Sequence, residues 1–279
     1  MTRGRLVVVG TPLGNLGDLS SRARDALTEA ALIACEDTRR TATLAQHVGA
    51  RGRLVAVHAH NEDERIGLVR ESIERGDVVA LVTDAGMPSV SDPGARVIDA
   101  VLDAGADVEV VPGPSAVTTA LAACGAPADR FLFAGFVPRK DGDRGRWLER
   151  ADHAGVSVVA FESPNRLPAT LAWLATRDAS RTVAVCRELT KLHEEVVRGP
   201  ASEVAERFAG GARGEITLVL WPPSGEDEAE RDARTATAVD VLTSAGLGPG
   251  AVADAVAALG LGSRNRAYRA ALDHPSRRS

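Results

Sequence analysis

Lysine is nearly absent from this chain. Of its 33 lysine and arginine residues, only Lys140 and Lys191 are lysines. A nucleotide composition that favours arginine codons accounts for most of this skew, but not for the two positions that keep a lysine. Because surroundings can shift the pKa of lysine whereas arginine stays charged, both positions are weak indications of function.

Several classes of protein are disfavoured by what else is missing. No apolar run approaches the roughly 20 residues of a membrane span, and MTRGRLVVVG leads directly into a strand pattern, so we expect no signal peptide and no membrane contact. The three cysteines, Cys35, Cys124 and Cys186, are an odd number without metal-type spacing. They fit buried thiols in a reducing compartment, which favours a cytoplasmic protein.

The charge and the aromatic content limit how the chain could contact nucleic acid. The net charge is −5, so any such contact has to be local rather than spread over a basic surface. Aromatic residues are only 3% of the chain, which argues against extensive base stacking.

The common nucleotide and metal motifs are also missing. There is no GxxxxGK[ST] motif, and the first loop, GTPLGN at residues 10–15, is not GxGxxG. A Walker ATPase and a dinucleotide-binding domain are therefore disfavoured. His58 and His60 alternate along a strand end and share a face, but no third ligand is suggested nearby, so we expect no metal.

Apolar runs and helical patterns alternate along the first part of the chain. This alternation predicts a mostly parallel sheet, with N-caps at Ser20 and Asn61. The expected strands are Leu6–Val9, Ala31–Ala34, Leu54–Val57, Val78–Val82 and Val108–Val111, and the expected helices are Ser20–Glu29, Thr38–Gln46, Glu62–Glu74, Gly94–Ala104 and Pro114–Cys124.

A second alternating segment follows, and then an acidic linker, PPSGEDEAE, leads to a small helical region. The chain is thus expected to be an α/β protein with two α/β domains, at residues 1–116 and 117–223, and a helical C-terminal region at 224–279. The turn at Gly210–Gly214 favours an antiparallel hairpin at the edge of the second sheet. Strands are expected at Phe131–Phe136, Val156–Phe161, Thr182–Arg187 and Glu215–Leu220, and helices at Arg144–Ala151, Arg166–Ala175, Ser202–Phe208, Ala229–Ala245, Gly250–Leu259 and Arg264–Leu272.

Two loops on consecutive strands suggest one shared pocket. LVTDAGMPSVSDPG at Leu81–Gly94 ends a strand on Asp84, and PGPSA at Pro112–Ala116 follows the next strand. Ligands of open α/β sheets lie outside the carboxyl ends of strands. Small residues allow the backbone to approach a ligand, and Asp84 can accept hydrogen bonds from hydroxyls. The alternative is that both are ordinary turns between strands and helices.

Nine segments that occur in order carry a resemblance to a known family. They are VGTPLGNLGD, CEDTRRT, HAHNE, TDAGMPSVSDPG, PGPSA, DRFLFAGFVPRK, FESPNRL, RELTK and GEITLVL. Together they resemble the ribosomal RNA small subunit methyltransferase I family, of the tetrapyrrole methylase-like superfamily. The resemblance covers essentially the full length, including NRAYRAAL near the C-terminus.

This resemblance implies a fold, a reaction and a set of cofactor residues. The fold is two α/β domains with S-adenosylmethionine in a deep cleft between them. The reaction is methylation of the ribose 2′-oxygen of a cytidine in the decoding region of 16S rRNA, in the small ribosomal subunit, by a homodimer. Met87 stands where threonine is usual, and Phe161 where tyrosine is common. The implied cofactor residues are Pro12, Asp84, Ala85, Gly86, Val90, Ser115, Ala116, Phe161, Glu215 and Ile216.

Methyl transfer to a ribose hydroxyl needs in-line positioning and a proton acceptor. Lys191 is the first candidate, because a desolvated and partly neutral lysine could take the proton. Glu36, Asp37 and Glu188 are alternatives, as base or as orienting groups. Each has a structural interpretation too: residues 36–38 could cap a helix, and Lys191 could pair with Glu188 or Glu194.

RNA contact is expected through basic residues, although rival functions stay open. The C-terminal segment 263–279 has five arginines against one acidic residue and could contact phosphate or be a solvated helix end. The rivals are a methylase of the same fold acting on a tetrapyrrole or a protein side chain, and a non-catalytic nucleotide-binding regulator. CEDTRRT, HNE and RELTK favour the rRNA enzyme. The candidates for the RNA backbone are Arg39, Arg40, Arg139, Lys140, Arg144 and Arg146.

Overall fold

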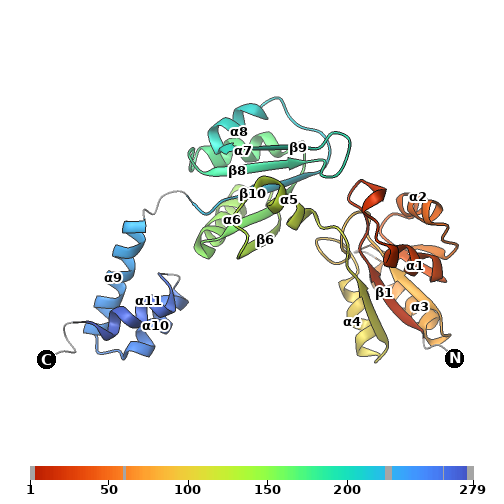
Figure 1. The fold of residues 1–279 in the computed structure, drawn as a ribbon, viewed down its shortest axis with the longest axis horizontal. Helices are drawn as coiled ribbons and strands as arrows, with labels where there is room; N and C mark the ends of the chain where they lie inside the picture. Colours follow the sequence, from red (N-terminus) through yellow and green to blue (C-terminus); the bar gives the residue numbers. More distant parts are fainter. Residues whose placement is uncertain (1–3, 59–60, 224–227, 260, 275–279) are drawn as a thin grey trace.

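The computed structural model describes residues 4–58, 61–223, 228–259 and 261–274, with the side chains of 228–232 left aside. Two five-stranded sheets and a group of three helices follow one another along the chain (Figure 1). We call the first sheet with helices α1–α4 the first domain, and the second sheet with helices α5–α8 the second domain.

The first sheet is wholly parallel, as its apolar runs predict, with strand order β3-β2-β4-β1-β5. Alternate residues of β1 serve opposite faces: Val7 and Val9 pack in the core with α1, whereas Leu6 and Val8 pack in the core with α3 and α4. Its elements are β1 (Arg5–Val9), α1 (Ser21–Glu29), β2 (Leu32–Cys35), α2 (Thr38–Val48), β3 (Arg53–Ala56), α3 (Glu62–Glu74), β4 (Val78–Leu81), α4 (Ala95–Asp103) and β5 (Asp107–Val111).

The central place of β1 in the sheet positions the two loops that follow β4 and β5. Since β4 and β5 flank β1 on either side and all three are parallel, the loops that follow them leave the same edge of the sheet. The strand order reverses at this point, which is where ligands of open α/β sheets bind.

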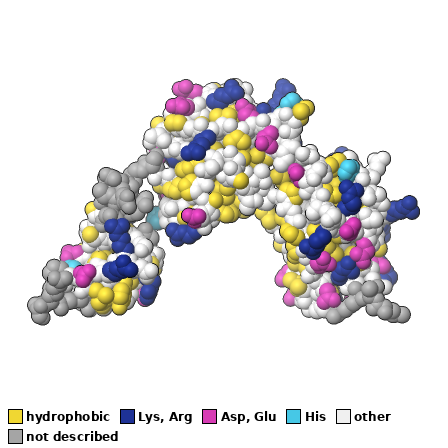
Figure 2. Space-filling view, in the orientation of Figure 1, with side chains coloured by type: hydrophobic (Ala, Val, Ile, Leu, Met, Phe, Trp, Pro, Cys, Tyr) yellow, Lys and Arg dark blue, Asp and Glu magenta, His cyan; other side chains and the backbone are white. Residues whose placement is uncertain are grey.

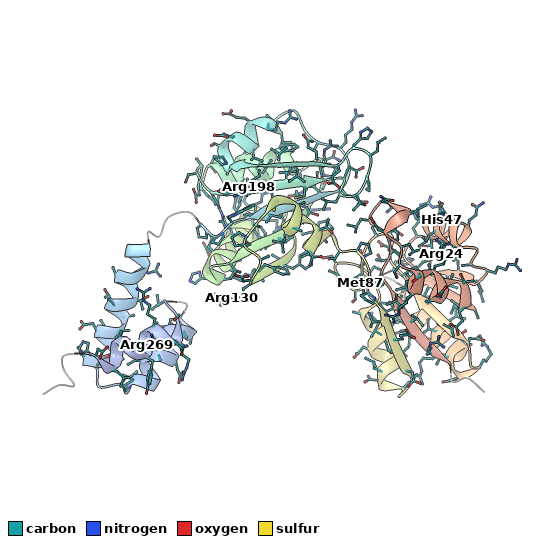
Figure 3. All side chains as sticks on the ribbon, viewed as in Figure 1. Arg24, His47, Met87, Arg130, Arg198 and Arg269 are labelled. Atoms are coloured by element: carbon teal, nitrogen blue, oxygen red, sulfur yellow. The ribbon has the colours of Figure 1, made fainter. Side chains whose placement is uncertain are left out.

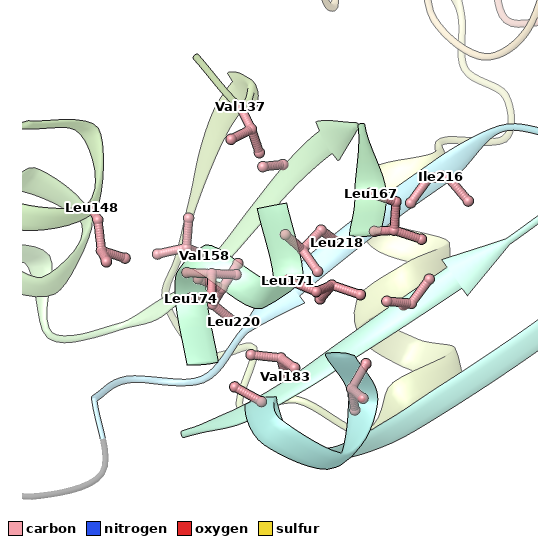
Figure 4. Close-up of a cluster of buried hydrophobic side chains, with 14 of the residues drawn as sticks. Val137, Leu148, Val158, Leu167, Leu171, Leu174, Val183, Ile216, Leu218 and Leu220 are labelled. Carbon is pink, nitrogen blue, oxygen red and sulfur yellow. The ribbon is translucent and has the colours of Figure 1, made fainter. Parts of the chain in front are cut away.

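The second sheet is mixed, with order β6-β7-β10-β8-β9 and only β6 and β7 parallel. Helix α5 packs on one face, and α6, α7 and α8 cover the other, where Leu167, Leu171 and Leu218 belong to the buried core (Figure 4). Its elements are α5 (Ala116–Cys124), β6 (Phe131–Phe136), α6 (Asp141–Ala154), β7 (Ser157–Glu162), α7 (Leu167–Ala175), β8 (Thr182–Arg187), β9 (Glu195–Pro200), α8 (Ala201–Arg207) and β10 (Ile216–Leu220).

One expectation about the second sheet is wrong, and one of its strands was not predicted. Strand β10 lies in the centre rather than at the edge, because its five residues are all buried and it pairs with β7 and β8 on either side. The two edges belong to β6 and to β9, a strand that the sequence pattern did not predict. Its short apolar stretch is interrupted by Arg198 and ends in Gly199 and Pro200, which an edge strand tolerates.

The two predicted caps have different outcomes. The Ser20 side chain accepts a hydrogen bond from the Ala23 amide, as expected. Asn61 precedes α3 without capping it. Its side chain instead accepts from the His58 amide at 2.8 Å and donates to the Ala56 carbonyl at 3.1 Å, so it fixes the turn before the helix.

The last three helices, α9 (Glu228–Ser244), α10 (Pro249–Ala258) and α11 (Arg264–Leu272), have a core of their own around Val252 and Val256. They stand apart from both sheets in Figure 1. Residues 224–227 of the predicted acidic linker lie outside the described residues. None of the helices in the described part of the chain combines the length and apolar character needed to cross a bilayer.

Candidate active site

A cavity of about 510 Å³ lies between the carboxyl edge of the first sheet and the second domain. Nine of the ten residues that the family resemblance assigns to the cofactor line it. The exception is Pro12, which is buried while its neighbour Leu13 lines the cavity instead. The nine are Asp84, Ala85, Gly86, Val90, Ser115, Ala116, Phe161, Glu215 and Ile216.

Hydrogen bonds and close backbone contacts hold together three loops of the first domain. The first loop follows β1, the second follows β4 and the third follows β5. Thr11 and Gly86 exchange backbone hydrogen bonds of 2.9 and 3.1 Å, and the Thr11 hydroxyl donates to the Thr83 carbonyl at 3.1 Å. A Cβ atom placed on Gly113 would lie 2.8 Å from the Cα of Gly10, so the first and third loops cross at a distance that only glycine allows. These contacts fix the loops from which Leu13, Gly86 and Ser115 reach the cavity.

Asp84 lies where the sequence places it, but in this structure it has protein partners. Its Oδ1 accepts a hydrogen bond from the Asp37 amide at 3.1 Å, and its Oδ2 accepts one from Arg40 Nη1 at 2.9 Å. Arg40 also approaches Glu215 at 3.7 Å, so this guanidinium links the first domain to the second across the cavity. The hydrogen bond with Asp84 raises the pKa of Arg40, which stays charged.

The second domain contributes an aromatic cluster to the wall of the cavity. The ring of Phe161 packs edge-to-face against Phe133 and Phe136, with ring centroids 5.1 and 5.5 Å apart. Met87 lies at the junction of the two domains (Figure 3) and lines the cavity. Hydrophobic side chains gather on the side of the second domain that turns toward the first (Figure 2).

Lys191, the first candidate for a neutral base, is paired with two carboxylates. Its Nζ lies 2.8 Å from Glu188 Oε1 and 3.1 Å from Glu215 Oε2. Burial lowers the pKa of Lys191, but the hydrogen bonds to these two carboxylates outweigh it and raise the pKa above its ordinary value. Lys191 therefore forms its ion pairs within the second domain, while its alkyl chain lies against Gly14 of the first domain. The expected alternative partner Glu194 instead accepts a hydrogen bond from the Thr190 amide.

The other candidate bases differ in position. Asp37 caps α2 and accepts a side-chain hydrogen bond from Arg39, which lowers the pKa of Asp37 to about 2. The hydrogen bond from Lys191 lowers the pKa of Glu188. Of the four candidates only Glu36 lines the cavity, where its Oε2 accepts a hydrogen bond from the Thr83 hydroxyl at 3.0 Å.

Asp92 lines the same cavity and was not singled out from the sequence. Burial raises its pKa to about 6, and the carboxylates of Glu36, Asp84 and Glu215 act in the same direction. The available signal was its place in SDPG, in the loop that also carries Asp84.

The residues predicted to contact RNA differ in how exposed their side chains are. Arg139 and Lys140 are exposed before α6, and Arg146 is exposed and paired with Asp143. The prediction that Arg144 contacts the RNA backbone is wrong, because its side chain is buried. It donates to the Arg139 carbonyl and stacks over the ring of Trp173 at 5.0 Å, so it holds the start of α6 rather than facing a phosphate.

Two further candidates lie on α2. Arg39 is exposed and paired with Asp37, and Arg40 faces the cavity. The described part of the chain contains no group of three or more potential metal-ligating side chains; His60 lies outside it.

Comparison with known proteins identifies the family. The model of the tetrapyrrole (corrin/porphyrin) methylases matches residues 5–205. A Thermotoga maritima protein named ribosomal RNA small subunit methyltransferase I is 42% identical over 218 residues, which cover 78% of this chain and 98% of that protein. This chain belongs to the ribosomal RNA small subunit methyltransferase I family. The protein of the same name from Mycobacterium tuberculosis is 46% identical over 79% of this chain and 78% of its own.

Solved structures support the fold of this methyltransferase. Diphthine synthase has a TM-score of 0.62 at 16% identity and covers 78% of this chain and 90% of its own. A uroporphyrin-III C-methyltransferase from Thermus thermophilus has a TM-score of 0.55 at 24% identity, over 79% and 95% of the two chains. These likenesses confirm the two α/β domains of the predicted fold class, and helices α9–α11 confirm its helical C-terminal region.

Proposed function

We propose that this methyltransferase transfers a methyl group from S-adenosylmethionine to the ribose 2′-hydroxyl of a cytidine in the decoding region of 16S rRNA. It acts in the cytoplasm on the small ribosomal subunit, as a homodimer. The observation that carries the proposal is the name shared by relatives that are 42–46% identical over more than three quarters of this chain.

The cavity has features that suit the methyl donor. The amide groups at the start of α5 donate no hydrogen bond to the side chain of the N-cap residue Ser115, and Ser115, Ala116 and Val117 line the cavity. A helix N-terminus of this kind favours a carboxylate, which the amino-acid part of the donor carries. The carboxylates of Asp84 and Glu215 suit its hydroxyls and its positive charge. When bound, the donor supplies an electrophilic methyl group on sulfur.

Residues at the edge of the second sheet support a homodimer. Strand β6 is an edge strand, and its Phe131 and Phe136 are exposed. Because exposed aromatic side chains and unpaired strand edges are typical of surfaces that meet another chain, this edge favours a second copy.

The direct test is to compare substrates. The protein is incubated with S-adenosylmethionine labelled on the methyl group and with free 16S rRNA, assembled small subunits or a tetrapyrrole. We expect label in assembled subunits, on the 2′-oxygen of one cytidine as located by nuclease digestion and mass spectrometry. Label in the tetrapyrrole alone would contradict the proposal, and so would absence of transfer with cofactor bound.

RNA affinity should depend on Arg139 and Lys140, because they follow Phe136, a residue of the cavity wall. The double change Arg139→Glu and Lys140→Glu should weaken binding to small subunits about tenfold or more. It should also lower the slope of log affinity against log salt by about 2, because two phosphate contacts are lost.

A double change of exposed arginines in the first domain, Arg24→Glu and Arg51→Glu, is the matched control. Equal losses in both double variants would show that only overall charge matters, and would overturn this placement of the RNA.

A further inference from the structure

The loop that carries Asp92 is fixed in an unusual conformation. Ser89 and Ser91 have φ values of +68° and +64°, a region that serine seldom occupies. The Ser89 amide donates to the Pro93 carbonyl at 3.3 Å, and the Val90 amide donates to the Met87 carbonyl at 3.4 Å. These contacts hold the loop so that Asp92, which is half-buried, lines the cavity.

The other carboxylates that line the cavity with Asp92 have partners of their own. The Thr83 hydroxyl, which has a single proton, donates it to Glu36 Oε2 at 3.0 Å. Arg40 donates to Asp84 at 2.9 Å, and Lys191 Nζ lies 3.1 Å from Glu215.

The charges around Asp92 also favour proton uptake. The carboxylates of Glu36, Asp84 and Glu215 face it from three different segments. The cation of the cavity, Arg40, lies within ion-pair distance of Asp84 and Glu215 instead. Within the described residues, no lysine, arginine or histidine forms an ion pair with Asp92.

We propose that Asp92 is the proton acceptor for the ribose 2′-hydroxyl, an inference that rests on the proposed function. The proton passes to an oxygen of the Asp92 carboxylate as the hydroxyl oxygen forms its bond to the methyl carbon. The bond from that carbon to sulfur breaks, its electron pair stays on sulfur as a neutral thioether, and Asp92 later releases the proton to water.

Asp92 fits this role better than Asp37 and Glu188, which do not line the cavity. The carboxyls of Asp37 and Glu188 have lowered pKa values, which makes them weak bases. A carboxyl with a pKa of about 6 is a stronger base, and most of it is still ionised at pH 7.

Single-turnover methylation of small subunits tests the chemical role. Asp92→Asn should lower the rate by roughly 10²–10⁴-fold while the affinity for S-adenosylmethionine, measured by calorimetry, stays within a few-fold of wild type. The wild-type rate should rise tenfold per pH unit below about pH 6 and then level, and this rise should be absent in Asp92→Asn. The matched control Asp99→Asn, on the exposed side of α4, should match wild type.

Wild-type transfer with an unchanged rate in Asp92→Asn would overturn the Asp92 assignment alone. Absence of wild-type transfer to RNA would overturn the proposed function. The pH dependence of the melting temperature would then still decide whether Asp92 binds a proton as inferred.

The melting temperature measured as a function of pH is a second test of the inference, and it needs no substrate. A carboxyl whose pKa is raised on folding stabilises the folded state less as pH rises from about 4 to about 6. Asp92→Asn removes the titrating carboxyl and therefore removes this decrease in stability between about pH 4 and about pH 6. The melting temperature of the variant should therefore exceed that of wild type above pH 6, and the difference should shrink toward pH 4. A variant less stable than wild type by the same margin at every pH would show a purely structural Asp92 and contradict the inference.

Discussion

Replacement of Asp84 by arginine should abolish measurable binding of S-adenosylmethionine to the folded protein. The Asp84 carboxylate lies at the base of the cavity, where it accepts hydrogen bonds from the Asp37 amide and Arg40. An arginine there removes these acceptors and places a second positive charge beside Arg40. We expect a loss of at least about 100-fold in affinity, equivalent to about 2.7 kcal/mol, measured by calorimetry.

The matched control is Asp99→Arg, which makes the same charge change on exposed α4 and should leave affinity unchanged. Asp84→Asn keeps the size of the side chain and should give a smaller loss. Wild-type affinity in a folded Asp84→Arg variant would show that the cofactor does not use this carboxylate.

Gly113→Ala should damage both stability and cofactor binding. The added Cβ would lie 2.8 Å from two backbone atoms of Gly10, and a backbone cannot turn aside as a flexible side chain can. The first and third loops must therefore separate, at a cost of about 1–3 kcal/mol in unfolding free energy. Because both loops contribute residues to the cavity lining, Leu13 from the first and Ser115 from the third, affinity for S-adenosylmethionine should fall at least about tenfold.

Gly67→Ala is the control for this change. Gly67 lies in α3 of the same domain, and no atom lies within 4 Å of its added Cβ. Alanine there should stabilise the protein by about 0.5–1 kcal/mol, because glycine is the poorer helix former. Urea unfolding of both variants makes the comparison. A Gly113→Ala protein as stable as Gly67→Ala would show that the loops have room to move.

Local patterns were sufficient for most elements of the fold. The buried runs of β1 and β4 and the alternating helices predicted the parallel sheet, because strands covered on both faces are apolar throughout. Strand β9 could not be predicted in this way, because an edge strand needs no long apolar run. The central place of β10 depends on pairing with β7 and β8, which are distant in the sequence.

The cavity was also predictable to a large extent. Loops that follow β4 and β5 had to share one edge of the sheet, so Asp84 and Ser115 could be placed together from the sequence. The protonation states could not be predicted. Lys191 is charged because it forms ion pairs with the carboxylates of Glu188 and Glu215. Glu215 belongs to a segment 24 residues further along the chain, so the sequence around Lys191 does not reveal this pairing.

By itself, therefore, the sequence determined the two α/β domains, the family and the loops that line the cavity, since these depend on periodicity and on motifs within single segments. The tertiary structure alone decided that Arg144 is buried against Trp173, that Arg40 bridges Asp84 and Glu215, and that Asp92 lies among carboxylates. The physical reason is that burial and charge depend on which distant segments come together, and both set the pKa of a side chain.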